Sequence, residues 1–146
     1  MIHMAPIPFF TSKELACPCC GMIRLDINFA AHLSYLRSKW NKPLTVNSVC
    51  RCPAHNARIG GHPDSLHLTV NQKWKTAGTM AADIAWRGWP KEQKIKFARL
   101  AHDIGLRIGL HDGFCHVDLG RTIEGIKPRP FLYGEWSNEF TPDEIL

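Results

Sequence analysis

Two separated segments of this chain carry residue types that bind zinc in proteins. His67 and Asp83 lie in the first segment, residues 65–83, and His116 begins the second, His116-Val117-Asp118. Two imidazoles and one carboxylate can hold zinc and leave its fourth position to water. Ligands this far apart in sequence share one ion only when the fold brings their segments together. We therefore interpret the set as a hydrolytic zinc site around which the chain is organised.

The second segment has the pattern of a strand that carries polar groups on one face. His116 and Asp118 alternate with apolar residues, and residues two apart on a strand point the same way. Polar side chains on an inner face need a partner or a metal ion. A lone histidine is more often a satisfied core or surface group, so the remaining histidines of the eight receive no role.

Length and composition favour one globular domain over residues 1–146. Hydrophobic residues make up 45% and charged residues 21%, which is ordinary for a globular protein. We expect a core over residues 10–120 and a tail, residues 121–146, that packs back through Trp136 and Phe140. No run approaches the ~20 apolar residues of a membrane-spanning helix, so we expect no stable membrane insertion. We also expect a monomer.

The net charge of +5 and the isoelectric point near 9.0 favour an anionic partner, such as nucleic acid, a membrane surface or a cell-wall polymer. The basic residues are scattered, which favours a merely solvated basic surface instead. The N-terminal segment, Met1–Phe10, lacks the basic and apolar regions of a signal peptide. We therefore expect synthesis in the cytoplasm, with any export depending on another component.

The cysteines allow three interpretations. The spacings Cys17-x-x-Cys20 and Cys50-x-Cys52 suit a structural zinc site. Two close pairs could also form disulfide bonds, although a cytoplasmic origin argues weakly against them. Free thiols buried near one another are the third alternative. Cys115 lies in an apolar context and is expected in the core.

Apolar periodicity predicts two long helices and several strands. Asp26 suits an N-cap, and the apolar stripe that follows predicts a helix over residues 26–40. Pro90 suits the first position of a second helix that ends at Gly105. The expected buried face of this helix consists of Ile95, Ala98, Ala101 and Ile104. The other expected elements are a helical turn at 11–15, strands at 44–49, 80–86, 106–110 and 114–119, and a short helix at 54–59 before a Gly60-Gly61 turn. One α+β domain accounts for these elements.

Four stretches of the chain together resemble one known family. They are Phe10-x-x-x-Glu14-Leu15-x-Cys17 with Cys20-Gly21; Ser48-x-x-Arg51-Cys52-Pro53-x-x-Asn56 with Gly60-Gly61; Ser65-x-His67 with Ala81-x-Asp83; and Phe114-x-His116-Val117-Asp118. In this order they resemble the zinc D-alanyl-D-alanine peptidases of bacterial cell walls and phage endolysins, in their short single-domain branch. The resemblance implies an α+β domain with a small antiparallel sheet and flanking helices, a fold shared with the signalling domain of hedgehog proteins.

The resemblance also assigns roles to individual residues. His67, Asp83 and His116 would be the ligands of a Zn2+ cofactor, which activates water and polarises the scissile carbonyl. Arg51 would lie near the metal and bind the substrate's carboxylate or steady the developing oxyanion. Ser65 would support the ligand segment or contact the substrate.

The chain departs from the family pattern in the spacing of two ligands. In the family motif Ser-x-His-x-x-Gly-x-Ala-x-Asp the ligands lie closer together than the sixteen positions that separate His67 and Asp83 here. Residues 68–80 must therefore loop out between them, and loop tips tolerate insertions. Trp74, flanked by two lysines, would form a wall for the substrate or belong to a solvated loop.

The general base is the second departure. Many relatives carry an acidic residue three positions before the last histidine ligand, where this chain has Gly113. Asp118, on the strand face of His116, and Asp112, in the preceding turn, are the alternatives for the catalytic base. Asp118 could instead orient a histidine.

These features predict a zinc metallopeptidase that hydrolyses a peptide bond in peptidoglycan stem peptides without a covalent intermediate. It would be an endolysin, or a D,D-carboxypeptidase or endopeptidase, that acts on the cell wall after release, as a phage or prophage lysin does. The alternative is a non-catalytic zinc-containing binding module of the same fold. A nucleic-acid binder built on the cysteines leaves His67, Asp83 and His116 unexplained, so we expect no nucleic-acid partner.

Overall fold

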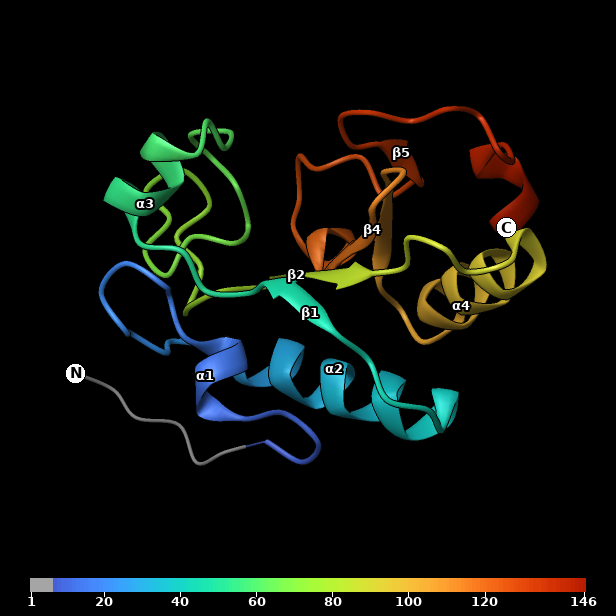
Figure 1. The fold of residues 1–146 in the computed structure, drawn as a ribbon. Helices are drawn as coiled ribbons and strands as arrows, with labels where there is room; N and C mark the ends of the chain where they lie inside the picture. Colours follow the sequence, from blue (N-terminus) through green and yellow to red (C-terminus); the bar gives the residue numbers. More distant parts are fainter. Residues whose placement is uncertain (1–6) are drawn as a thin grey trace.

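Figure 1 shows the computed structural model, which describes residues 7–146. Residues 1–6, which make up most of the segment used for the signal-peptide expectation, lie outside the described residues. The elements in chain order are α1 (Ser12–Leu15), α2 (Ile27–Trp40), β1 (Val46–Ser48), α3 (Pro53–Arg58), β2 (Ala81–Ala85), α4 (Lys91–Asp103), β3 (Arg107–Leu110), β4 (Phe114–Asp118), the 3-10 helix η1 (Gly120–Thr122), β5 (Phe131–Leu132) and the 3-10 helix η2 (Pro142–Ile145).

The strands form one sheet in the order β1-β2-β4-β3-β5. The first four strands of this order pair antiparallel, and β5 pairs with β3 in parallel. The helices α2 and α3 lie on opposite sides of β1 and β2 (Figure 1). The expected α+β class, with a small antiparallel sheet and flanking helices, is therefore confirmed. The sequence does not predict β5, because this strand has two residues and lies in a proline-rich tail.

The sheet separates the hydrophobic core from a polar face. Asp83 of β2 pairs with His116 of β4, which also pairs with Gly109 of β3. Because side chains alternate along a strand, these residues and Asp118 point to one face. The residues between them point to the other face, where they join the core with α2 and α4: Ala82, Ile84, Ile108, Leu110, Cys115 and Val117.

The helix α2 forms where the sequence predicts it. The Asp26 carboxylate accepts a hydrogen bond of 2.9 Å from the Phe29 N–H and so caps the first turn. Phe29, Leu33 and Trp40 of the predicted apolar stripe are buried. Asn41 follows in the left-handed conformation and ends the helix.

The helix α4 differs from the prediction in its start and in its buried face. Pro90 is its N-cap rather than its first residue, because the backbone there is extended, with ψ 148°. Ile95 and Ile104 are half-buried, whereas Phe97 and Lys94 are buried. The Lys94 ammonium reaches a glutamate of the C-terminal segment at 2.7 Å, and this ion pair allows its burial.

The other expected elements are present, although the strands are shorter than predicted. The strand β1 covers three residues rather than 44–49, because its pairing with β2 is irregular between Val46 and Ser48. The predicted hairpin is present as β3 and β4, and the two short helical segments are α1 and α3. Gly60 has φ +73° and Gly105 has φ +109°, as the predicted turn and helix end require.

The C-terminal segment packs against the body of the protein. The ring of Trp86 lies 6.5 Å from that of Trp136 and 6.2 Å from that of Phe140, measured between centroids. These contacts place β5 and the residues after it beside the polar face of the sheet. Within residues 7–146, no helix combines the length and the apolar character needed to cross a membrane.

Gly109 creates the space in which β5 meets the polar face. A Cβ atom at this position would lie 2.9 Å from Phe131, 3.0 Å from Tyr133 and 3.1 Å from His116. We expect Gly109→Ala to lower the free energy of unfolding by about 1–3 kcal/mol, as overpacking does. Denaturant unfolding measures this change, and unaltered stability would contradict the close packing. Asp26→Ala, which removes a cap far from β5 at a cost of about 1 kcal/mol, provides the scale.

Candidate metal centre

His67, Asp83 and His116 meet on the polar face of the sheet, and we call them the triad. The Oδ1 atom of Asp83 lies 3.1 Å from Nε2 of His67 and 3.0 Å from Nδ1 of His116. The pairing of β2 with β4 fixes the second distance, because it sets Asp83 opposite His116. His67 comes from the loop after α3, and its carbonyl accepts a 2.8 Å hydrogen bond from the Thr79 hydroxyl, just before β2. All three side chains are buried.

The remaining nitrogen of each triad histidine has its own partner. Nδ1 of His67 lies 2.8 Å from the Val49 carbonyl, and Nε2 of His116 lies 2.7 Å from Oδ2 of Asp118. These acceptors place the protons on those two nitrogens, so the lone pairs of Nε2 of His67 and Nδ1 of His116 face Asp83. Such partners are what metal-binding histidines ordinarily have.

The donor set fits zinc. Two ligand atoms that each lie ~2.0–2.1 Å from a tetrahedral zinc ion are ~3.3 Å apart, which is close to both separations measured from Asp83 Oδ1. Two imidazole nitrogens and a carboxylate oxygen are ordinary zinc ligands, and they leave one position of a tetrahedron open. The three residues therefore suit the cofactor expected from the sequence.

The buried charges shift the titration of the triad. Burial acts to lower the pKa of His116, but its hydrogen bonds to Asp118 and Asp83 outweigh burial and raise the pKa to about 9. Burial lowers the pKa of His67. For Asp83, burial acts in the opposite direction, yet the two histidines hold the pKa of its carboxyl well below the usual range. Without metal, the centre thus contains an ionised Asp83 and a protonated His116.

Asp118 is engaged on both of its oxygens behind His116. Oδ2 accepts hydrogen bonds of 2.7 Å from His116 and 2.7 Å from Arg107, and Oδ1 accepts from Arg107 at 3.0 Å and from the Gly120 N–H at 2.7 Å. Burial acts to raise the pKa of Asp118, but His116 and Arg107 lower it to about 2. This geometry favours the orienting carboxylate among the two roles considered, and a role as general base stays a prediction.

The other predicted base, Asp112, lies in the turn between β3 and β4. Its Oδ1 accepts hydrogen bonds of 2.9 Å from both the backbone N–H and the hydroxyl of Ser137. Asp112 lines a small hollow together with Arg87 and Lys94. Among the described residues, those that line the cleft at the triad do not include Asp112.

Arg51 lies directly beside the triad. Its Nη2 atom is 3.2 Å from Oδ2 of Asp83, the oxygen that faces away from the histidines. Two further hydrogen bonds fix the guanidinium: Nε donates to the Ser48 hydroxyl at 2.9 Å and Nη1 donates to Oδ1 of Asn56 at 3.3 Å. Gly61 permits this arrangement, because a Cβ there would overlap the Asn56 side chain. The structure thus places Arg51 where the sequence predicts it, and its role toward a substrate stays a prediction.

Ser65 and the segment 68–80 support His67. The Ser65 hydroxyl accepts a hydrogen bond of 3.1 Å from the His67 N–H. The segment is folded tightly, because the buried Asn71 amide donates to the carbonyls of Asp64 and Ser65 at 3.0 and 3.1 Å. The Asn71 Oδ1 atom also accepts from the Trp74 N–H at 2.8 Å. A turn built this way holds Trp74 in place.

A cleft of about 450 Å³ opens onto His116 and Asp118. Ser65 and Trp74 line it, so the indole forms one wall, as one of the two alternatives for this residue holds. The half-buried Trp74 ring packs against the core and receives the Lys73 ammonium at 4.7 Å from its centroid. The cleft therefore contains both the triad's open side and predicted substrate residues.

Tyr133 is a residue of the cleft that the sequence gives no reason to select. Its ring stacks on the His116 imidazole with centroids 4.3 Å apart and planes 11° apart. Burial raises the pKa of the Tyr133 phenol, and Arg51 opposes this shift in part. The position becomes visible only when β5 pairs with β3, which no local pattern in the tail indicates.

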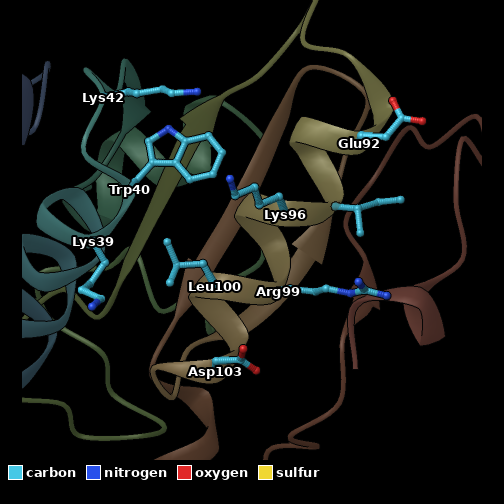
Figure 2. Close-up of a pocket in the computed structure, with 9 residues that line it drawn as sticks. Lys39, Trp40, Lys42, Glu92, Lys96, Arg99, Leu100 and Asp103 are labelled. Atoms are coloured by element: carbon cyan, nitrogen blue, oxygen red, sulfur yellow. The ribbon is translucent and has the colours of Figure 1, made fainter.

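A second hollow, of about 650 Å³, lies between the end of α2 and the exposed face of α4 (Figure 2). Trp40 and Leu100 form its apolar part. The charged residues that line it are Lys39, Lys42, Glu92, Lys96, Arg99 and Asp103. It shares no lining residue with the cleft at the triad, so we assign the metal chemistry to the smaller cleft.

Comparison with known proteins gives one match. Residues 8–118 match the family model described as Peptidase M15. This range covers well over half of the chain and contains the whole triad. A search of curated proteins found no match.

Zinc binding is expected to weaken as the pH falls. His116 must lose its proton to bind the metal, and its pKa of about 9 without metal means that protons compete below that pH. We expect the apparent zinc affinity to rise about tenfold per pH unit between about pH 7 and 9 and to level off above that range. Competition titrations against a chelator measure this dependence.

Two variants provide the comparison for this titration. Asp118→Asn removes a carboxylate that raises the pKa of His116, so its pH dependence should move to lower pH and its zinc affinity should fall about 10–100-fold. Asp112→Asn, outside the cleft, should change neither. An affinity that stays constant over the range would contradict the protonated state of His116.

Proposed function

The chain belongs to the Peptidase M15 family, a family of zinc metallopeptidases, and from this membership we propose that it hydrolyses a peptide bond in the stem peptides of bacterial peptidoglycan. The single observation that carries the proposal is the convergence of His67 Nε2 and His116 Nδ1 on one oxygen of Asp83. This arrangement suits a catalytic zinc rather than a closed structural site, because it supplies three ligands beside an open cleft.

The triad and its neighbours divide the work of such a reaction. Zinc, when bound, supplies Lewis acidity that polarises the scissile carbonyl and activates water for direct attack. Asp118 keeps the His116 imidazole in the tautomer whose Nδ1 lone pair faces the metal position. Tyr133 stacks on the same imidazole and prevents it from tilting.

Arg51 supplies a fixed positive charge at the edge of the centre. Three side chains, those of Ser48, Asn56 and Asp83, hold its guanidinium, so it needs little reorganisation to meet a developing negative charge. A substrate carboxylate or the oxyanion of the tetrahedral intermediate fits this position. The first partner would suit a carboxypeptidase and the second would suit an endopeptidase as well.

The basic character of the protein supports a wall substrate. The net charge is +5, and four cations stand against two carboxylates along the hollow between α2 and α4. Cell-wall polymers of many bacteria are anionic, and an opposite charge raises the local concentration of enzyme on such a surface. An endolysin released onto the wall is the setting that joins this charge to the peptidase site.

Digestion of purified peptidoglycan tests the proposal. We expect the zinc-loaded protein to release stem-peptide fragments, whose new termini in mass spectra identify the bond that is cut. His116→Ala should lose the zinc of the triad and the hydrolysis together. Zinc retained by the triad of the unaltered protein, with no cleavage of the wall but with binding to it, would support the non-catalytic module instead.

The wall formed by Trp74 gives a second test of the cleft. Trp74→Ala removes an aromatic surface beside the triad without touching a metal ligand, so we expect kcat/KM on intact peptidoglycan to fall about tenfold or more while zinc content is unchanged. Gln72→Ala, an exposed residue of the same segment, is the matched control. Equal kinetics for the two variants would remove Trp74 from the substrate site.

A further inference from the structure

Three thiols meet at a place separate from the triad. Cys17 and Cys20 lie in the turn after α1, and Cys52 lies at the start of α3. One sulfur atom from each can be drawn into a group whose members all lie within 4.8 Å of one another. Residues 17 and 52 are thus brought together by the fold rather than by closeness in sequence.

The backbone around these cysteines is arranged to present sulfur. The Cys17 N–H donates to the Met22 carbonyl at 2.9 Å, and the Gly21 N–H donates to the Cys17 carbonyl at 2.8 Å. Gly21 has φ +75°, a conformation that favours glycine and that turns the chain back after Cys20. The result is a tight Cys-x-x-Cys-Gly turn with both thiols on one side.

Backbone donors point at two of the three sulfur atoms. The Cys52 N–H lies 3.3 Å from Sγ of Cys17, and the His55 N–H lies 3.4 Å from Sγ of Cys52. Burial acts to raise the pKa of Cys17, but hydrogen bonds from the backbone N–H groups of Cys52, Cys20 and Cys19 lower it to about 7. Such an environment favours thiolates, which are the form that binds metal ions.

We propose that Cys17, Cys20 and Cys52 bind a second zinc ion, which has a structural role and leaves its fourth position to a water molecule. Three thiolates with a Cys-x-x-Cys pair are a common ligand set for structural zinc. Each of the three cysteines is unpaired in the structure. The neighbouring Arg58 guanidinium, 2.6 Å from Sγ of Cys19, supplies positive charge next to a site that carries net negative charge when filled.

The position of the site indicates what the ion would do. Cys52 directly follows Arg51 and precedes Asn56, which holds the Arg51 guanidinium. An ion shared with Cys17 and Cys20 would fasten this segment to the N-terminal arm, closing a loop of the chain between residues 17 and 52. The site would therefore stabilise the segment that carries Arg51, and it does not depend on the proposed peptidase activity.

Metal analysis of a protein without the catalytic zinc site tests the proposal. In the double variant His67→Ala/His116→Ala, we expect about one zinc per chain to remain, as the cysteine site requires. Adding Cys52→Ser or Cys17→Ser to this background should remove it. Cys19→Ser is the matched control, because Cys19 is adjacent but lies outside the group, and it should retain the ion. Substitution with Co2+ should give the intense near-ultraviolet absorption of thiolate-to-cobalt charge transfer.

Alkylation of the unaltered protein keeps the test independent of variants that fail to fold. Added zinc should protect Cys17, Cys20 and Cys52 from iodoacetamide while Cys19 still reacts, as peptide mass spectra would show. A Cys17–Cys20 disulfide, an absence of zinc from the double variant, or loss of zinc from Cys19→Ser would each overturn the proposal. None of these readouts measures hydrolysis, so failure here is distinguishable from failure of the proposed function.

Discussion

The pairing of Asp83 with His116 across β2 and β4 is the constraint on which the rest of the structure depends. It puts a carboxylate and an imidazole 3.0 Å apart on the polar face of the sheet, and a shift of one residue in register would turn both side chains away. The apolar residues that alternate with them hold the register, because they fill the core beneath. The core and the metal centre are therefore specified by the same strands.

Burial of so many charges is tolerated because each has a partner. Asp83 is held by two histidines and Arg51, and Asp118 by His116, Arg107 and a backbone N–H. Among residues 7–146, the buried side-chain polar atoms without a partner are those of Thr76 and Trp136, and neither belongs to the centre. A fully partnered buried network is rigid. Rigidity is what a metal site needs if it is to hold its ligand atoms in place.

The sequence predicts the parts of this structure that local patterns determine. The cap at Asp26 and the apolar stripe after it define α2, and the alternation around His116 defines β4. The misjudged parts depend on distant contacts: Lys94 is buried because it pairs with Glu139, and Asp118 binds Arg107 from the neighbouring strand. Tyr133 joins the cleft only through the two-residue strand β5, which lies in a tail without periodicity.

The central claim is that His67, Asp83 and His116 hold one zinc ion. Anomalous diffraction on either side of the zinc absorption edge, from crystals of the zinc-loaded protein, tests it most directly. The account predicts an anomalous peak bounded by Nε2 of His67, Nδ1 of His116 and the carboxylate of Asp83. Crystals in which zinc is bound elsewhere, while these three side chains keep their hydrogen bonds to one another, would contradict it.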